Sequence, residues 1–367
     1  MLYYLRHLED WFGPFRLFGY WNFRSMGAVV TAFAVSLVFG PPIIRVLRRL
    51  GARDQGREFG GLNVASKEGT PTMGGILILV SLFGSSLLWC DLANQQVRIV
   101  LCAALYFGAI GGLDDLLKVL RRSNERGLSR HWKYAAQIAF GALVGVLFLT
   151  RGSSPYDPRV AQTLTVPLYR EGIYLGWSYL AVVVVFTVLA SNAVNITDGL
   201  DGLAIVPAML VAGVLGVFAY VVGDGGVQGL AHKLLFRHLP GTSELVVFSC
   251  ALIGAGVGFL WFNSHPASVF MGDTGSLALG GVLATLALLI KQEIVFFVAG
   301  GIFVVEAGTS FIQDYVGLKL LGRRIFFRAP YHHSLLHQGY SETKVTVRFW
   351  IISAIFAVMA LATLKLR

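Results

Sequence analysis

Carboxylate and amide side chains recur at a short spacing in the segment SNAVNITDGLDGLA. The positions are three residues apart and are occupied by Asn192, Asn195, Asp198 and Asp201. A step of three residues turns the side-chain direction by about 60° in a straight helix, so all four cannot share one face. The interspersed glycines permit a bend that would gather them. Oxygen-bearing groups of this kind suit Mg²⁺ and the polar groups of a sugar or base, with a helix cap as the alternative.

Acidic residues in two further segments could take part in the same chemistry. Asp114 and Asp115 close the apolar run GGLDDLLKVL, and adjacent carboxylates repel each other unless a cation lies close by. Lys118 follows four and three residues later, on the same helix face. Asp273 lies among small residues in VFMGDTGSLALGG. The alternatives to a site are a charge cluster at a helix end for the Asp pair and a helix cap for Asp273.

Two basic segments could bind anions. SKEGTPTMGG contains Lys67 and, in a Thr-Pro-Thr turn, Thr70, although a loop with a helix cap would have the same composition. APYHHSLLHQG contains His332 and His333 and follows three arginines. No acidic or cysteine partner for zinc is close in the sequence, so phosphate binding is favoured over a zinc site.

The elements that must position these residues are membrane helices. Of the 367 residues, 55% are hydrophobic and 14% are charged, compared with about a quarter charged in soluble domains. This composition excludes a soluble globular protein and a disordered one. The three cysteines lie in apolar runs and indicate neither zinc nor disulfides. The formal charge of +10 comes from loop residues that suit anionic lipid headgroups, so a nucleic-acid partner is not expected.

Ten apolar stretches approach the roughly 20 residues that a membrane-spanning helix needs. They cover 25–46, 73–90, 97–117, 132–150, 173–191, 202–222, 244–262, 275–290, 294–316 and 346–365. The predicted fold is therefore an all-α polytopic membrane protein. We expect a single transmembrane catalytic domain over 1–367, in which residues 1–24, rich in aromatic side chains, form an interfacial N-terminal segment.

The distribution of basic residues predicts the topology. With ten spans, alternate gaps share one face, and three gaps on the same face hold six Lys or Arg each, 18 of the 30 in the chain. The positive-inside rule makes this face cytoplasmic and both termini extracytoplasmic. The acidic segments fall on the same face, which indicates a cytoplasmic site. Glu306 lies within the ninth stretch, where an acid is costly and usually functional.

Taken together, the motifs resemble those of the phospho-N-acetylmuramoyl-pentapeptide transferase family. They are TPTMGG, GGLDDLLKV, SNAVNITDGLDGLA, WFNSHPASVFMGDTGSLALGG and APYHH, in this order. The resemblance extends from about residue 24 to the end. It implies a ten-helix enzyme of the bacterial inner membrane that uses Mg²⁺. Such an enzyme transfers phospho-MurNAc-pentapeptide from UDP-MurNAc-pentapeptide to undecaprenyl phosphate, giving UMP and lipid I for peptidoglycan synthesis. The resemblance leaves the oligomeric state open, and a homodimer is among the states that it allows.

The resemblance also implies roles for individual residues. Asp114, Asp115 and Asp273 match the three essential aspartates of the family, and Asp273 matches its magnesium ligand. Asn195 is a second candidate ligand by analogy with related sugar-phosphate transferases. Positions that bind substrate are matched by Lys67, Thr70, Asn195, Asp198, Asp201, Phe270, His332 and His333, with Lys118 and Asn192 as further candidates. The chain departs from the family at Ser334, where a third histidine is usual.

These assignments predict a mechanism and leave rivals. Asp114 would deprotonate or orient the lipid phosphate with support from Asp115, and Asp273 would bind the metal. One alternative is a related transferase that uses UDP-GlcNAc. A secondary transporter is another, although its acids would be expected near the bilayer midplane rather than at span ends. An aspartate-rich prenyltransferase is disfavoured because the sequence has no DDxxD.

Overall fold

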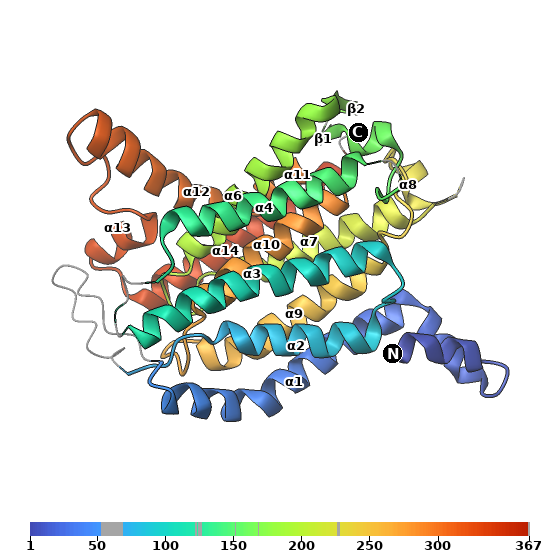
Figure 1. Cartoon of the computed structure of the whole chain (residues 1–367), viewed down its shortest axis with the longest axis horizontal. Coiled ribbons are helices and arrows are strands. Elements are labelled where there is room, and N and C mark those ends of the chain that lie inside the picture. Colours follow the sequence, from blue (N-terminus) through green and yellow to red (C-terminus); the bar gives the residue numbers. More distant parts are fainter. Residues whose placement is uncertain are drawn as a thin grey trace.

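Long helices dominate the structure and run side by side along one axis (Figure 1). The computed structural model describes residues 1–52, 69–121, 123, 127–150, 152–167, 169–225 and 228–365. Within them the regular structure other than helix is one two-stranded sheet. The prediction of an all-α polytopic membrane protein is confirmed.

Eight helices of the described chain are long and apolar enough to cross a membrane. They are α1 (Trp21–Arg49), α3 (Gln95–Leu120), α4 (Arg130–Leu149), α6 (Tyr179–Thr197), α7 (Ile205–Gly223), α9 (Glu244–Asn263), α10 (Gly272–Leu289) and α14 (Glu342–Ala362). The second predicted stretch forms the shorter helix α2 (Gly75–Trp89). The ninth forms α11 (Glu293–Ala299) and α12 (Gly301–Phe311), which continues to Leu320. Each of the ten predicted stretches therefore contains a helix.

Two of the predicted stretches differ from the observed helices. The fifth was expected over 173–191, but residues 173 and 174 belong to an antiparallel hairpin of β1 (Thr163–Val166) and β2 (Tyr169–Tyr174). Helix α6 therefore starts later and extends to Thr197. The ninth was expected as one helix, but it bends by 84° at the glycine pair between α11 and α12. Hydropathy reports only that these residues are apolar and cannot distinguish a strand or a bend from a straight helix.

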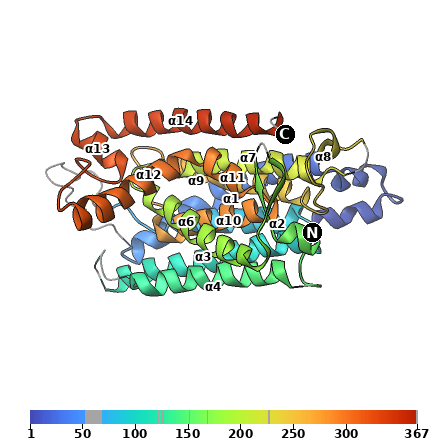
Figure 2. The same ribbon diagram turned by 90° about the horizontal axis from the view of Figure 1, so that it is seen from above.

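Helix α10 lies at the centre of the bundle (Figure 2). It packs against α2, α3, α6 and α7. Of the 18 residues of α10, 89% are buried, compared with 28% of the most apolar 18-residue segment of α1 at the edge. After Asp273 the helix has no charged side chain. The first turn of α10 therefore projects its acid from an element that neighbouring helices fix on all sides.

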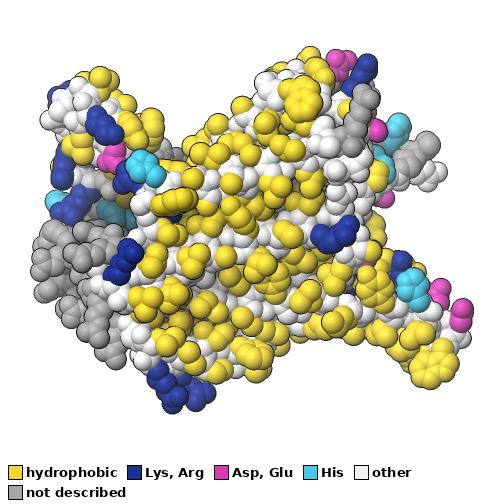
Figure 3. All heavy atoms as spheres, in the orientation of Figure 1, with side chains coloured by type: hydrophobic (Ala, Val, Ile, Leu, Met, Phe, Trp, Pro, Cys, Tyr) yellow, Lys and Arg dark blue, Asp and Glu magenta, His cyan; other side chains and the backbone are white. Residues whose placement is uncertain are grey.

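The two ends of the bundle differ in what they hold. Both termini and the hairpin lie at one end, whereas α13 (Tyr331–His337) and the carboxyl ends of α3 and α6 lie at the other (Figure 1). Hydrophobic side chains cover most of the visible surface between the ends, where basic side chains are sparse (Figure 3). This distribution is typical of a protein that spans a bilayer.

Candidate active site

Two motifs that are distant in sequence pair to form the start of α10. The Phe270 N–H donates to the Pro71 carbonyl at 2.8 Å, and the Gly74 N–H donates to the Phe270 carbonyl at 2.7 Å. A Cβ atom on Gly75 would lie 2.1 Å from the backbone nitrogen of Gly275. The glycines of TPTMGG and MGDTG therefore permit a backbone contact that no larger residue allows.

A carboxylate from another helix caps the N-terminus of α10. Asp115 of α3 accepts the backbone N–H of Asp273 at 3.2 Å, the N–H of Thr274 at 2.8 Å and the Thr274 hydroxyl at 2.7 Å. The N-cap position of α10 itself is Met271, which has no capping side chain. Asp273 is therefore not the cap of its own helix, and its carboxylate is available for other contacts.

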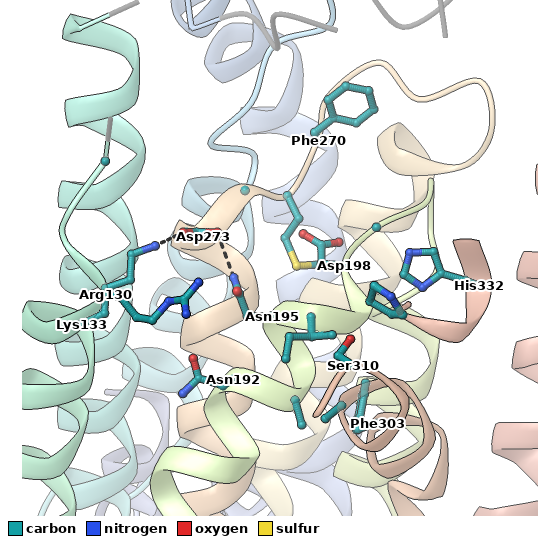
Figure 4. Close-up of a pocket in the computed structure, with 18 of the residues that line it drawn as sticks. Arg130, Lys133, Asn192, Asn195, Asp198, Phe270, Asp273, Phe303, Ser310 and His332 are labelled. Carbon is teal, nitrogen blue, oxygen red and sulfur yellow. Dashed lines mark hydrogen bonds and ion pairs between the residues drawn. The ribbon is translucent and has the colours of Figure 1, made fainter. Parts of the chain in front are cut away.

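Two lysines and an amide surround the carboxylate of Asp273, and Figure 4 shows two of these partners, Lys133 and Asn195. Lys118 Nζ of α3 lies 3.1 Å from the carboxylate, and Lys133 Nζ of α4 lies 2.7 Å from it. The Asn195 amide donates to its other oxygen at 2.9 Å. The same ammonium groups lie 2.7 and 2.8 Å from Asp114. The structure thus brings together four predicted residues of the sequence analysis and adds Lys133, which was counted there only among the basic residues of the crowded face.

Asp114 lies behind the two lysines. Its side chain is fully buried and accepts the Leu128 N–H at 2.6 Å. A Cβ atom on Gly127 would lie 2.4 Å from its Oδ1, so the loop before α4 covers it closely. In this structure Asp114 holds Lys118 and Lys133 in place, and its assignment as the base stays a prediction.

Asp273 opens on a cavity of about 2040 Å³. Phe270, Asp198 and His332 lie around it (Figure 4). The cavity continues between α6 and the bent pair α11 and α12, where its walls are apolar and include Leu189, Phe297, Phe303 and Phe311. A polyanionic group and an apolar chain could therefore be held in one continuous space.

The amides of SNAVNITDGLDGLA face different partners. Besides its bond to Asp273, Asn195 donates to the Ser276 hydroxyl at 2.8 Å. Asn192, one turn earlier, donates to Gln137 of α4 at 2.6 Å and still lines the cavity. All four polar residues of this segment therefore line the cavity, and of its two amides Asn195 is the one that bonds to Asp273.

The two aspartates of this segment lie beyond the end of α6. Burial raises the pKa of Asp198 to about 8, and the negative charge of Asp273 adds to the shift. Asp201 Oδ2 lies 2.9 Å from His265 Nδ1, and the Asp201 N–H donates to Glu342 at 3.0 Å. Asp201 therefore belongs to a second polar cluster that also borders the cavity.

The histidine pair comes from the short helix α13. His332 is buried, and its Nδ1 lies 2.7 Å from a carboxylate oxygen of Glu306 in α12. His333 lines the cavity beside it. Ser334, at the third position, points instead to the preceding loop, where its hydroxyl accepts the Arg328 N–H at 3.1 Å. A side chain at this position contacts backbone rather than the cavity.

The remaining predicted residues lie at the edge or outside the described chain. Lys67 lies outside the described residues. Thr70 is described but is not among the residues that line the cavity, whereas Thr72 of the same turn is. Sequence reasoning missed Lys133 and Thr72 as site residues. The available signal was their position, since both lie in segments that had been assigned to the cytoplasmic face.

The chemistry of the cluster fits a divalent cation. Oxygen atoms of Asp114, Asp115 and Asp273 lie within 4.8 Å of one another, and two ammonium groups leave one negative charge uncompensated. The Asp115 carboxylate already accepts the hydrogen bonds that cap α10, so Asp273 is the best-placed metal ligand. Asn195 presents its NH₂ group to Asp273 and would offer its oxygen after a rotation of the amide.

Comparison with known families identifies the chain. The model of glycosyl transferase family 4 matches residues 97–291, which include α3, α6 and α10. This chain belongs to glycosyl transferase family 4. Signature 1 of phospho-N-acetylmuramoyl-pentapeptide-transferase matches residues 67–79, which include the turn that pairs with Phe270. The resemblance found in the sequence is thereby confirmed. The protein is a membrane-bound phospho-sugar transferase of a family that uses a nucleotide sugar, a polyprenyl phosphate and, in general, a divalent metal.

Proposed function

We propose that the protein transfers phospho-MurNAc-pentapeptide from UDP-MurNAc-pentapeptide to undecaprenyl phosphate, giving lipid I and UMP for peptidoglycan synthesis. The observation that carries this proposal is the Asp273 carboxylate between Lys118 and Lys133, at the head of a cavity that continues into an apolar groove. The signature of residues 67–79 supports the muramoyl substrate. The whole chain would act as one catalytic domain, since His332 and the Thr72 turn complete the cavity from outside the family match.

The reaction exchanges one phosphoanhydride bond for another. A phosphate oxygen of the lipid attacks the phosphorus that carries the sugar, and a new P–O bond forms. The bond from this phosphorus to the oxygen of the uridine-bearing phosphate breaks, and UMP leaves with its electron pair. A covalent phospho-sugar intermediate is the alternative route to the same products.

The residues at the head of the cavity would neutralise the transferring group. Lys118 and Lys133 approach from two helices and could each bind an oxygen of the diphosphate, because ammonium groups pair well with phosphate. Asp273, with Asn195, would hold Mg²⁺, which supplies positive charge to the diphosphate when it is bound. Asp115 fixes Asp273 through the backbone of α10.

The apolar part of the cavity would hold the prenyl chain. Its walls come from α6, α11 and α12, and two of the side chains that form them, Leu189 and Phe311, are also more than half exposed. A groove that is open to the bilayer lets a lipid enter sideways while its phosphate reaches the polar head. This layout favours an enzyme over a transporter, in which charged sites are expected near the midplane.

The proposed orientation follows the charge count. In the inner membrane of a bacterium, the 18 basic residues of the three crowded gaps would lie on the cytoplasmic side, which is also the side of the site. Both termini would then be extracytoplasmic, and the N-terminal segment with its exposed Trp11 and Phe12 would lie at the outer interface.

The test is a reconstituted assay with purified protein, UDP-MurNAc-pentapeptide, undecaprenyl phosphate and Mg²⁺, in which released UMP is measured. A matched reaction contains UDP-GlcNAc in place of the muramoyl substrate. We expect turnover in the first reaction and little in the second. Equal or faster turnover of UDP-GlcNAc would replace the proposed substrate by the alternative one.

A further inference from the structure

A buried acid and a buried histidine pair across the wall of the cavity. Glu306 of α12 is fully buried, and its two carboxylate oxygens contact the same residue of α13. One accepts the backbone N–H of His332 at 3.2 Å, and the other lies 2.7 Å from its Nδ1. Because two bonds join the same pair, both the position of the backbone and the rotation of the ring are fixed.

The other nitrogen of the ring lacks a protein partner. His332 Nε2 is buried and makes no hydrogen bond within the described chain. It lies beside Gly199, on which a Cβ atom would be 2.2 Å from Nε2. Gly199 is exposed, and both residues line the cavity. His332 lies on the side of the cavity away from Lys133 (Figure 4). A buried ring nitrogen without a partner is unfavourable, so a ligand group that reaches past Gly199 would gain a hydrogen bond there.

The pairing determines what kind of group this ligand must offer. A buried carboxylate is costly unless hydrogen bonds or a positive charge compensate it, and the partner of Glu306 is the His332 ring, whose doubly protonated form would carry that charge. In this form Nδ1 donates to Glu306 and Nε2–H is a second donor. A donor on a positive ring, at the edge of a cavity that holds two lysines, suits a phosphoryl oxygen.

We propose that Glu306 is a positioning residue, which holds the His332 ring so that Nε2 donates to a phosphoryl oxygen of a substrate beside Gly199. The proposal rests on the proposed function, because that reaction brings phosphate into the cavity. The phosphoryl oxygen belongs either to the nucleotide diphosphate or to the polyprenyl phosphate. Measuring kcat and KM for each substrate separately distinguishes these two sources.

The first test is a double-mutant cycle of Glu306→Leu and His332→Ala. If Glu306 acts through His332, we expect each single variant to lower kcat/KM by roughly 10- to 100-fold, the range for one charge-assisted hydrogen bond. The double variant should then be no worse than His332→Ala. Glu306→Gln retains an acceptor for Nδ1 and should recover part of the activity. Additive losses, or normal activity of Glu306→Leu, would overturn the proposal.

The second test displaces the His332 ring from the side of Gly199, because an added Cβ 2.2 Å from Nε2 forces the ring or the Gly199 backbone to move. Gly199→Ala adds a methyl group in front of the ring, so we expect a loss similar to that of His332→Ala. The matched control is Gly84→Ala in α2, where the nearest atom to an added Cβ is 3.9 Å away. This variant also decides the matter if Glu306→Leu does not fold. Full activity of Gly199→Ala would contradict a substrate contact at Nε2.

A binding measurement separates this proposal from the reaction itself. Calorimetric titration of UDP and, separately, of undecaprenyl phosphate into purified protein needs no turnover. If the wild-type protein binds either ligand but releases no UMP, the proposed reaction fails while the positioning role can still be tested. In that case the variants must weaken binding of one ligand by the same 10- to 100-fold, and unchanged dissociation constants for both would refute the inference.

Discussion

The substitution Asp115→Asn tests whether Asp115 acts as the cap of a neighbouring helix. Its carboxylate receives three donors from the first turn of α10, two of them backbone N–H groups of Asp273 and Thr274. Asparagine retains the size of the side chain but replaces one acceptor oxygen by an NH₂ group. In the better amide orientation, Oδ1 keeps both bonds from Thr274, and the NH₂ group faces the N–H of Asp273.

The expected cost follows from these contacts. Losing one hydrogen bond to a charged group costs about 1.5–3 kcal/mol, and the other two bonds become neutral and weaken. Part of this loss is offset because an amide is easier to bury than a carboxylate. We therefore expect Asp115→Asn to destabilise the fold by about 2–4 kcal/mol. Activity should fall as well, because the first turn of α10 carries Asp273.

The assay combines denaturation of the protein in detergent with UMP release. Thr274→Val removes one of the three donors to Asp115 and should give a smaller loss of stability. The matched control is Thr285→Val, further along α10, where the hydroxyl bonds only to the carbonyl of Gly281. An Asp115→Asn protein that is as stable as the wild type but inactive would refute the capping role and indicate direct action on the substrate.

Three further outcomes are expected. Asp273→Asn should lower turnover by at least roughly 100-fold and recover part of it at high Mg²⁺; near-normal turnover of the folded variant would contradict the metal assignment. Burial lowers the pKa of Lys291, between α10 and α11, from 10.5 to about 8 against the opposing effect of Glu293. Because the unfolded chain then binds more protons between pH 8 and 10.5, wild-type stability should rise with pH across this interval relative to Lys291→Met/Glu293→Gln. The cysteine of a Leu2→Cys variant in a cysteine-free background should be labelled by a membrane-impermeant reagent in intact cells. Labelling only after permeabilisation would reverse the proposed topology.

Much of the fold could be predicted because hydropathy alone identifies membrane helices. All ten stretches contain a helix, and α9 starts and ends within one residue of its expected range. The hairpin of β1 and β2 could not be predicted, since its last two residues, Ile173 and Tyr174, are apolar and lead directly into the apolar stretch that forms α6. The bend at the glycine pair between α11 and α12 likewise could not be predicted, because it depends on how these helices pack and hydropathy carries no information about packing.

The candidate site could be predicted by residue type but not by partner. Asp115 and Asp273 were found as acids at helix ends, and a helix cap was considered only as the alternative role of Asp273. The actual cap comes from a residue 158 positions earlier. Glu306 was noted as a costly acid in an apolar stretch, but its partner His332 lies 26 residues later. Such pairings depend on how helices pack, and local spacing carries no information about them.

The arrangement of the two lysines bears on how the chain enters the membrane during synthesis. Lys118 and Lys133 both contact Asp114, and all three residues belong to α3 and α4, which are made well before α10. A lone charge is costly in lipid, so a pair that forms early lowers the barrier to insertion of these helices. Asp273 arrives later and joins ammonium groups that are already in place. Assembly of the complete site therefore requires that α3, α4, α6 and α10 have been inserted in their mutual register.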